Sequence, residues 1–268
     1  MGFFGAVKHR VKLFVHFFEY RSKNKKIVKE TRLRKEGNRD SKFEKIASLR
    51  DVYSGKRCFI VATGPSLTLD DLNLIKNEIC FSMNSMCKMF DKTSWRPTFY
   101  GVQDAHIYEH MKDDMEHYID SNTIVLIADH LEEYFKIPQK YCLFPFNHYY
   151  HQYEAEKRQY FVKFSNESDV IVYDGYTITY SLIQIAIYMG FSEICLLGVD
   201  FNYQQGQKNH FVDSGYVDKN IYSEYKRMLL SYEKAKEFAD NHGIHIFNCT
   251  RGGMLEVFPR KSLEDCLK

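Results

Sequence analysis

Polar side chains and a glycine follow several apolar runs of this sequence at the points where the runs end. The run Cys58-Phe59-Ile60-Val61-Ala62 leads directly into Thr63-Gly64-Pro65-Ser66, and Asn84 ends the next apolar run. If these runs are parallel strands, their carboxyl ends share one edge of a sheet, where open α/β proteins bind ligands. The residues expected at this edge are Thr63, Gly64, Pro65, Ser66, Asn84, Gln103, Asp104 and Asp200. The pattern predicts a ligand site in which Gly64 allows a close approach to the backbone.

Two helix starts lie next to these residues. Thr68-Leu69-Asp70-Asp71 has the form of a capping box, and Thr177-Ile178-Thr179 precedes a strongly apolar stretch. Free amides at a helix N-terminus favour phosphate, so both starts suit an anionic ligand. A second interpretation is that the threonines, and Asp104 as well, are ordinary helix N-caps. The glycine-rich phosphate-binding motifs G-x-x-x-x-G-K-[ST] and G-x-G-x-x-G are absent from the sequence.

The elements that must position these residues alternate along the chain after Gly55. Apolar runs predict strands at 57–62, 79–83, 97–103, 123–128, 141–145, 194–199 and 244–249. Helical patterns lie at about 68–76, 104–118, 178–189 and 219–241. This alternation predicts an α/β fold, a Rossmann-like and mostly parallel sheet with helices on both faces. We expect residues 46–268 to form this single catalytic domain.

Residues 1–45 differ in character from the rest of the chain. Residues 3–18 place apolar side chains at helical spacing with basic residues between them, which predicts a basic amphipathic helix. Such a helix suits an anionic membrane surface, reached through residues 1–20. Docking on the protein's own body, or on a second subunit in a homo-oligomer, fits the pattern equally well. Residues 20–45 are highly charged and read as a linker or an exposed helix.

Composition excludes some classes of function. The net charge of +2 gives no case for nucleic-acid binding. The seven cysteines are scattered, lack C-x-x-C spacing and partly lie in apolar runs, which predicts reduced buried thiols and no zinc site. No apolar stretch has the length of a bilayer span. We therefore expect a cytoplasmic protein that is either free or peripheral on the inner face of the plasma membrane.

Several of these segments together resemble one superfamily of bacterial transferases. They are Gly64-Pro65-Ser66-Leu67, Asn84, Thr177-Ile178-Thr179 and the run from Tyr188 to Asp200. The superfamily includes bacterial sialyltransferases, the motility accessory factor glycosyltransferases and the 6-hydroxymethylpterin diphosphokinase MptE-like proteins. The resemblance covers about residues 50–260 and is nearest to the MptE-like group.

The resemblance implies a GT-A-like variant of the fold and a nucleotide-sugar donor such as a CMP-sialic-acid-like molecule. Gly64, Ser66 and Asn84 match residues that bind the donor nucleotide in the sialyltransferases, and Thr177 matches the region near the donor sugar. Thr63 stands where those enzymes commonly carry Asn, which leaves the donor open. We expect Gly64→Val to abolish nucleotide binding and leave the fold largely intact. The full set of expected donor contacts is Thr63, Gly64, Pro65, Ser66, Asn84, Gln103, Asp104, Thr177, Thr179, Asp200, Tyr203 and Arg251.

A catalytic base is also expected from the resemblance. The sialyltransferases use a histidine after the strand that ends in Gly-x-Asp, and His210 with Tyr203 before it lies in that part of this chain. A histidine can take a proton from an acceptor hydroxyl near neutral pH. His106 is the rival base, and either residue could be an ordinary surface histidine.

We therefore expect a glycosyltransferase that adds a sugar to a surface glycan acceptor and requires no metal or other cofactor. One alternative is an Mg²⁺-dependent 6-hydroxymethylpterin diphosphokinase-like enzyme, for which Asp104 and Asp200 would be the candidate carboxylates. The other is a non-catalytic nucleotide-binding module that anchors an assembly through residues 1–45.

Overall fold

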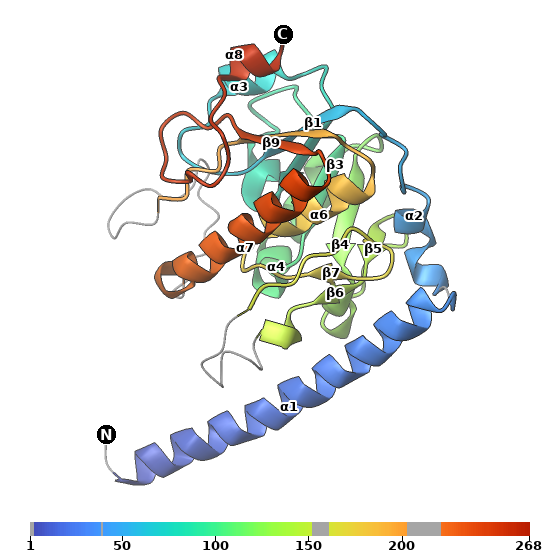
Figure 1. Ribbon diagram of the computed structural model, residues 1–268, viewed down its shortest axis with the longest axis vertical. Coiled ribbons are helices and arrows are strands. Elements are labelled where there is room, and N and C mark those ends of the chain that lie inside the picture. The colour runs from blue at the N-terminus through green and yellow to red at the C-terminus, as the bar shows by residue number, and fades with distance from the viewer. Residues whose placement is uncertain (1–2, 39, 152–160, 203–220) are drawn as a thin grey trace.

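A seven-stranded sheet forms the centre of the protein, and every pair of neighbouring strands in it is parallel (Figure 1). The computed structural model describes residues 3–38, 40–151, 161–202 and 221–268. From edge to edge the strands are β5 (Cys142–Phe144), β4 (Ile124–Ala128), β3 (Phe99–Val102), β2 (Cys80–Met83), β1 (Arg57–Val61), β8 (Glu193–Leu197) and β9 (His245–Asn248). These are the seven strands that the sequence predicts.

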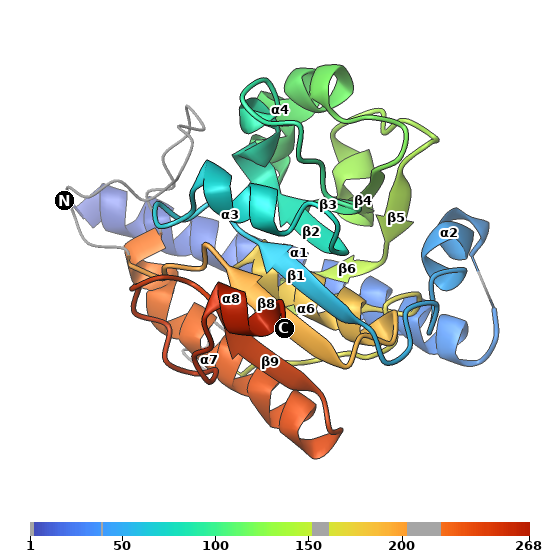
Figure 2. The same ribbon diagram turned by 90° about the horizontal axis from the view of Figure 1, so that it is seen from above.

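Helices cover both faces of this sheet, which confirms the Rossmann-like α/β fold. The helices α3 (Leu69–Leu74) and α4 (Ala105–Tyr118) lie on one side, and α6 (Ile178–Tyr188) and α7 (Ile221–Asn241) lie on the other (Figure 2). The shorter elements are η1 (Ser41–Phe43), α2 (Glu44–Ala47), η2 (Asn84–Met89), η3 (Asp129–Glu133), α8 (Leu263–Cys266) and the strand pair β6 (Phe146–Asn147) and β7 (Val172–Tyr173).

Burial explains why these segments fold as they do. All four residues of β2 are buried, as expected for a parallel strand that is covered on both faces. Every residue of α6 is buried, including the polar Thr179, Ser181 and Gln184, and a largely apolar helix of this kind belongs inside a protein. Gly101 of β3 provides part of the space, since a Cβ atom there would lie 2.9 Å from Leu182 of α6. The helix α6 therefore sits close beneath the middle of the sheet.

The strand order reverses at β1. From β1 the chain builds β2, β3, β4 and β5 outward on one side, whereas β8 and β9 lie on the other. In an open parallel sheet, such a switch point opens a crevice at the carboxyl ends of the strands. The segments that follow β1 and β8 are therefore the walls of the expected ligand site.

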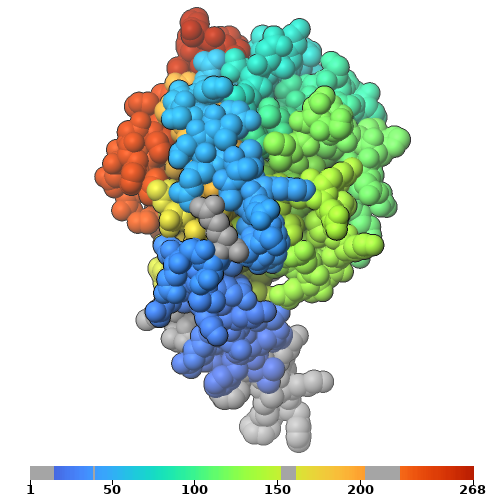
Figure 3. Space-filling model, turned by 90° about the vertical axis from the view of Figure 1, so that its right-hand side faces the viewer, coloured from blue at the N-terminus to red at the C-terminus, as the bar shows by residue number. Residues whose placement is uncertain are grey.

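The N-terminal helix is longer than the sequence predicts. A single helix, α1 (Phe3–Lys35), continues past residue 18 through the charged segment, so residues 20–35 form an exposed helix and not a linker. Lys23 pairs with Glu133, and the Asn147 side-chain amide donates a hydrogen bond to Asn24. These contacts hold the second half of α1 along the protein body (Figures 1 and 3), while the ribbon of its N-terminal end extends away from it (Figure 1). Among the described helices, none has both the length and the apolar character that crossing a bilayer requires.

Candidate functional site

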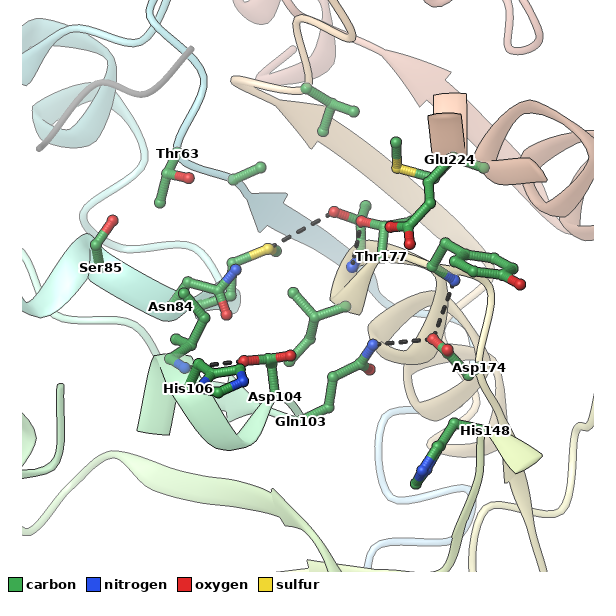
Figure 4. A pocket seen from close by; sticks show the side chains of 18 of the residues that line it. Thr63, Asn84, Ser85, Gln103, Asp104, His106, His148, Asp174, Thr177 and Glu224 are labelled. Carbon is green, nitrogen blue, oxygen red and sulfur yellow. Dashed lines mark hydrogen bonds between the residues drawn. The ribbon is translucent and has the colours of Figure 1, made fainter. Parts of the chain in front are cut away.

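A cleft of about 890 Å³ opens at the carboxyl edge of the sheet, at the switch point. The side chains that line it come from the ends of β1, β2, β3 and β8 and from the start of α6 (Figure 4). The cleft brings together most of the residues that the sequence predicts for the site, namely Thr63, Gly64, Asn84, Gln103, Asp104, His106, Thr177, Thr179 and Asp200. Pro65, Ser66 and Arg251 do not line it. Tyr203 and His210 lie outside the described residues.

Gly64 and Asp200 form the junction between β1 and β8. The backbone N–H of Ser66 donates to Asp200 Oδ1 at 3.1 Å, and the Ser66 hydroxyl donates to Asp200 Oδ2 at 2.8 Å. Burial raises the pKa of Asp200 above its usual range, although the hydrogen bonds from Ser66 oppose this shift. Ser66 thus acts on the cleft through Asp200 and does not itself line the cleft.

The glycine at position 64 is required by this packing. A Cβ atom on Gly64 would lie 2.0 Å from Asp200 Oδ2 and 2.3 Å from the carbonyl oxygen of Gly198. Because the second atom belongs to the backbone of the neighbouring strand end, a side chain at position 64 must displace the loop. The expectation that Gly64→Val leaves the fold largely intact is therefore corrected for this loop, which a valine side chain would displace.

Asn84 begins η2 directly after β2 in a strained conformation. Its φ of 53° is left-handed, a conformation that asparagine tolerates better than most residues with a side chain. The hydroxyl of buried Tyr100 donates to the Asn84 carbonyl oxygen and holds this backbone in place. The side-chain amide of Asn84 faces the cleft (Figure 4). Backbone strain of this kind is often found where a side chain must be aimed at a ligand.

A hydrogen-bonded network on the opposite wall was not predicted from the sequence. Gln103 Nε2 donates to Asp174 Oδ1 at 3.1 Å, and the Ser181 hydroxyl donates to Gln103 Oε1 at 2.6 Å. His151 Nε2 lies 2.9 Å from Asp174 Oδ2, and only 1% of the His151 side chain is exposed. A carboxylate beside an imidazole helps to orient the ring, and many enzymes use this arrangement to prepare a general base.

Two further histidines line the cleft next to this network. The rings of His130 and His148 have centroids 4.6 Å apart. Burial lowers the pKa of His130 to about 4 and lowers the pKa of His148 well below its usual value. Both imidazoles are therefore neutral at physiological pH and provide hydrogen-bonding groups without charge.

The two helix starts at the cleft have different surroundings. Asp104 is the N-cap of α4 and accepts a hydrogen bond from the Ile107 backbone at 2.9 Å, as the second interpretation of this residue predicts. His106 lies in the first turn of the same helix, exposed at the cleft rim. Thr177 is the N-cap of α6 and accepts from the Thr179 backbone at 3.3 Å. The start of α6 thus faces the cleft with the amides of its first turn.

Arg251 is placed away from the cleft. Its guanidinium binds both carboxylate oxygens of Asp71, at 2.6 and 2.5 Å, and also donates to the Ser66 carbonyl oxygen. Burial alone would raise the pKa of Asp71, but hydrogen bonds from Arg251 and Thr68 lower it. Arg251 therefore stabilises the capping box of α3 and does not line the described cleft, and its role as a donor contact stays a prediction. Among the described residues that line the cleft there is no lysine or arginine.

A family model described as "6-hydroxymethylpterin diphosphokinase MptE-like" matches residues 35–206. The chain belongs to the MptE-like family. The matched segment includes β1 to β8 and therefore nearly all residues of the described cleft walls.

The MptE-like chain is also similar to a solved structure, that of the Maf glycosyltransferase from Magnetospirillum magneticum AMB-1. The TM-score is 0.51 with 19% sequence identity over 82% of this chain, so the similarity shows a shared fold. The chain covers only 37% of the length of that glycosyltransferase. A search of curated protein sequences finds no match.

Only one of the three cleft histidines that were not predicted, His130, has a recognisable signal in the sequence. His130 follows β4 within two residues, so the strand-end argument that found Asn84 and Gln103 would also have found it. His148 and His151 follow the two-residue strand β6, which is too short to leave a sequence pattern.

Proposed function

We propose that this MptE-like protein is a glycosyltransferase that takes a sugar from a nucleotide-activated donor, with a CMP-sialic-acid-like sugar as donor and a surface glycan as acceptor. The observation that carries the proposal is the cleft itself. Its volume of about 890 Å³ suits a ligand of nucleotide-sugar size, and its described polar lining includes hydroxyls, amides, imidazoles and the carboxylates of Asp104, Glu109, Asp174, Asp200 and Glu224, without lysine or arginine. The hydroxyls, amides and imidazoles suit sugar hydroxyls and a nucleobase. The fold shared with the Maf glycosyltransferase supports the same assignment.

The nucleotide is proposed to bind between the Gly64 turn and Asn84. Asn84 provides an amide that can bind base or ribose, and α6, which is capped by Thr177, provides a helix N-terminus for phosphate. The donor sugar then extends toward Gln103 and the histidines.

Three histidines are candidates for the catalytic base. The sequence proposes His106 and His210, and the geometry of the described residues supports His151 best. In the transfer, an acceptor hydroxyl oxygen bonds to the anomeric carbon while the bond from that carbon to the donor phosphate breaks. The hydroxyl proton passes to the imidazole, and the nucleotide leaves with the electron pair of the broken bond. Asp174 is a positioning residue that holds the imidazole from the other side.

The first prediction concerns this base. His151→Asn should lower kcat for transfer by about 10²–10⁴-fold, the usual range for a general base, and leave the dissociation constant for the donor nucleotide nearly unchanged. Asp174→Asn should lower kcat less, because the histidine remains. Nucleotide binding measured by thermal shift and calorimetry separates the two effects, and it also reports whether each variant is folded.

The matched variants are His106→Asn, at the exposed rim, and His210→Asn. A large loss in one of these with normal turnover in His151→Asn would move the base to that residue. Absence of any turnover with cytidine, uridine, guanosine or adenosine diphosphate and monophosphate sugars, despite nucleotide binding, would contradict a transferase.

The description of the family favours a second candidate, a diphosphokinase acting on a hydroxymethylpterin. That reaction transfers a diphosphate from ATP and depends on Mg²⁺. AMP release that requires both the pterin and Mg²⁺ would establish it. Sugar transfer that continues with a chelator present would establish the glycosyltransferase.

A further inference from the structure

Three of the seven cysteines, far apart in the sequence, come together beneath helix α8. Cys195 lies in the middle of β8, Cys249 directly follows β9, and Cys266 is the last residue of α8. Their sulfur atoms all lie within 4.8 Å of one another, and Cys249 Sγ is 3.0 Å from Cys266 Sγ. All three side chains are buried. In the part of the chain that is described, the other four cysteines join no such group.

The spacing of the three sulfurs is close to that of a thiolate metal site. Zn²⁺ binds cysteine sulfur at about 2.3 Å in tetrahedral geometry, which places neighbouring sulfurs about 3.8 Å apart. The observed sulfur distances, from 3.0 Å for the Cys249–Cys266 pair up to 4.8 Å at most, bracket this value. A disulfide would use two of the three sulfurs and leave the third unexplained, whereas a thiophilic cation uses all three.

The surroundings of the cluster suit thiolates. The Arg57 guanidinium donates to the Cys266 carbonyl oxygen, and Lys261 Nζ lies 4.7 Å from the centre of the Phe247 ring on the neighbouring strand. A Zn²⁺ ion with three thiolates carries one net negative charge, which these cations offset. Glu193 Oε1 lies 3.9 Å from Cys195 Sγ but does not belong to the group of atoms that lie within 4.8 Å of one another.

We propose that Cys195, Cys249 and Cys266 together bind one Zn²⁺ ion. Zinc binding replaces the thiol protons, which are released to solvent. The ion would join α8 to β8 and β9 and close the loop between Cys249 and Cys266. That loop contains Gly253, which packs on the backbone of Asp200, and Met254, whose N–H donates to the Asp200 carbonyl oxygen at 2.7 Å. The zinc site therefore supports the β8 end of the cleft without taking part in it.

The test is the zinc content of the intact chain. The protein is purified with a phosphine reductant, incubated with Zn²⁺, desalted and analysed by inductively coupled plasma mass spectrometry. We expect one zinc ion per chain, and a lower melting temperature after chelation that Zn²⁺ restores. Cys195→Ser and Cys266→Ser should lose at least nine tenths of the zinc. Cys142→Ser, which removes a buried thiol outside the cluster, should keep it.

Three outcomes would overturn the proposal. The first is a reduced wild-type protein that retains no zinc, a result that does not depend on how well any variant folds. The second is stoichiometric zinc in folded Cys266→Ser. The third is a native protein whose mass and peptide map show a Cys249–Cys266 disulfide, because that bond removes two of the three ligands.

Discussion

At the scale of single residues, a substitution at Gly64 tests how tightly the carboxyl ends of β1 and β8 pack together. Gly64→Ala should lower the free energy of unfolding by about 1–3 kcal/mol, the usual cost of overpacking, because its Cβ would meet the Gly198 carbonyl at 2.3 Å. Urea denaturation of the two proteins measures this difference. Nucleotide affinity should fall as well, since the displaced loop lines the cleft.

Gly243→Ala is the matched control. Gly243 has a φ of +68° and no atom within 4 Å of the added Cβ, so this variant carries only backbone strain of about 1 kcal/mol. A Gly64→Ala protein that is no less stable than Gly243→Ala would show that the loop after β1 yields freely.

The buried imidazole of His130 should make the free energy of unfolding depend on pH. Its pKa is about 4 in the folded protein because of burial, against about 6.5 in an unfolded chain. As the pH falls, the unfolded chain therefore takes up the proton first. The contribution of the neutral ring is fully present above pH 6.5 and is lost between about pH 6.5 and pH 4, on the order of 3 kcal/mol in total. Urea denaturation at several pH values measures this loss.

The variant His130→Asn should flatten that part of the profile, and His117→Asn, on the exposed face of α4, should not. His148 shares the burial of His130, so some dependence on pH will remain. An unchanged profile in His130→Asn would show that other groups cause it.

At the scale of elements, Arg251 connects the C-terminal loop to the first turn of α3. Asp71 is buried with only 3% of its side chain exposed, so removing the cation leaves a buried carboxylate with Thr68 as its remaining partner. Because the guanidinium itself is half exposed, we expect Arg251→Ala to cost about 1–2 kcal/mol of stability. The affinity for nucleotide should change little.

Lys236→Ala provides the comparison, since its pair with Asp240 is exposed on α7 and should contribute less than about 1 kcal/mol. If Arg251→Ala instead abolishes nucleotide binding in a stable protein, the arginine must leave Asp71 for the ligand, and its predicted role as a donor contact would be correct.

The elements that could be predicted from the sequence are those buried on both sides. Strands such as β1 and β8 read as unbroken apolar runs, and their ends identified Thr63, Asn84 and Asp200 as neighbours. The strands β6 and β7 have only two residues each, which is too short for an alternating hydrophobic pattern to appear in the sequence. His151 and Asp174 meet only because this pair brings them together, and their contact depends on tertiary structure alone.

The same limit applies to α1 and to the cysteines. The second half of α1 packs through polar pairs such as Lys23 with Glu133, which leave no apolar stripe in the sequence. Cys195, Cys249 and Cys266 have no motif spacing, because three separate elements supply them.

At the scale of the whole molecule, α1 gives the protein a basic extension. We expect the intact chain to bind vesicles that contain anionic lipid and to release them as salt rises, since exposed charges are screened over about 8 Å at physiological ionic strength. Vesicle co-sedimentation measures this. A chain that lacks residues 1–14 should lose the binding and keep its melting temperature, because the ring contact of Tyr20 with Tyr149 and the Lys23 pair remain.

A second deletion variant lacks residues 1–36. It also loses the Lys23 pair and the Arg34 contact with the Val170 carbonyl oxygen, so its melting temperature should be lower. If the intact chain ignores vesicles and the shorter deletion changes the oligomeric state, the helix is an assembly arm.

The pairing of β1 with β8 also sets the order in which the protein can be made. The strand β1 ends at Val61, and its neighbour on one side, β8, begins only at Glu193. At about 5–20 residues per second, a ribosome needs on the order of ten seconds to synthesise the chain between them. During that time β1 has one edge without a partner, and the cleft lacks the wall that contains Asp200. The nascent chain is thus exposed to aggregation until β8 emerges, and slow translation through this stretch would lengthen that period.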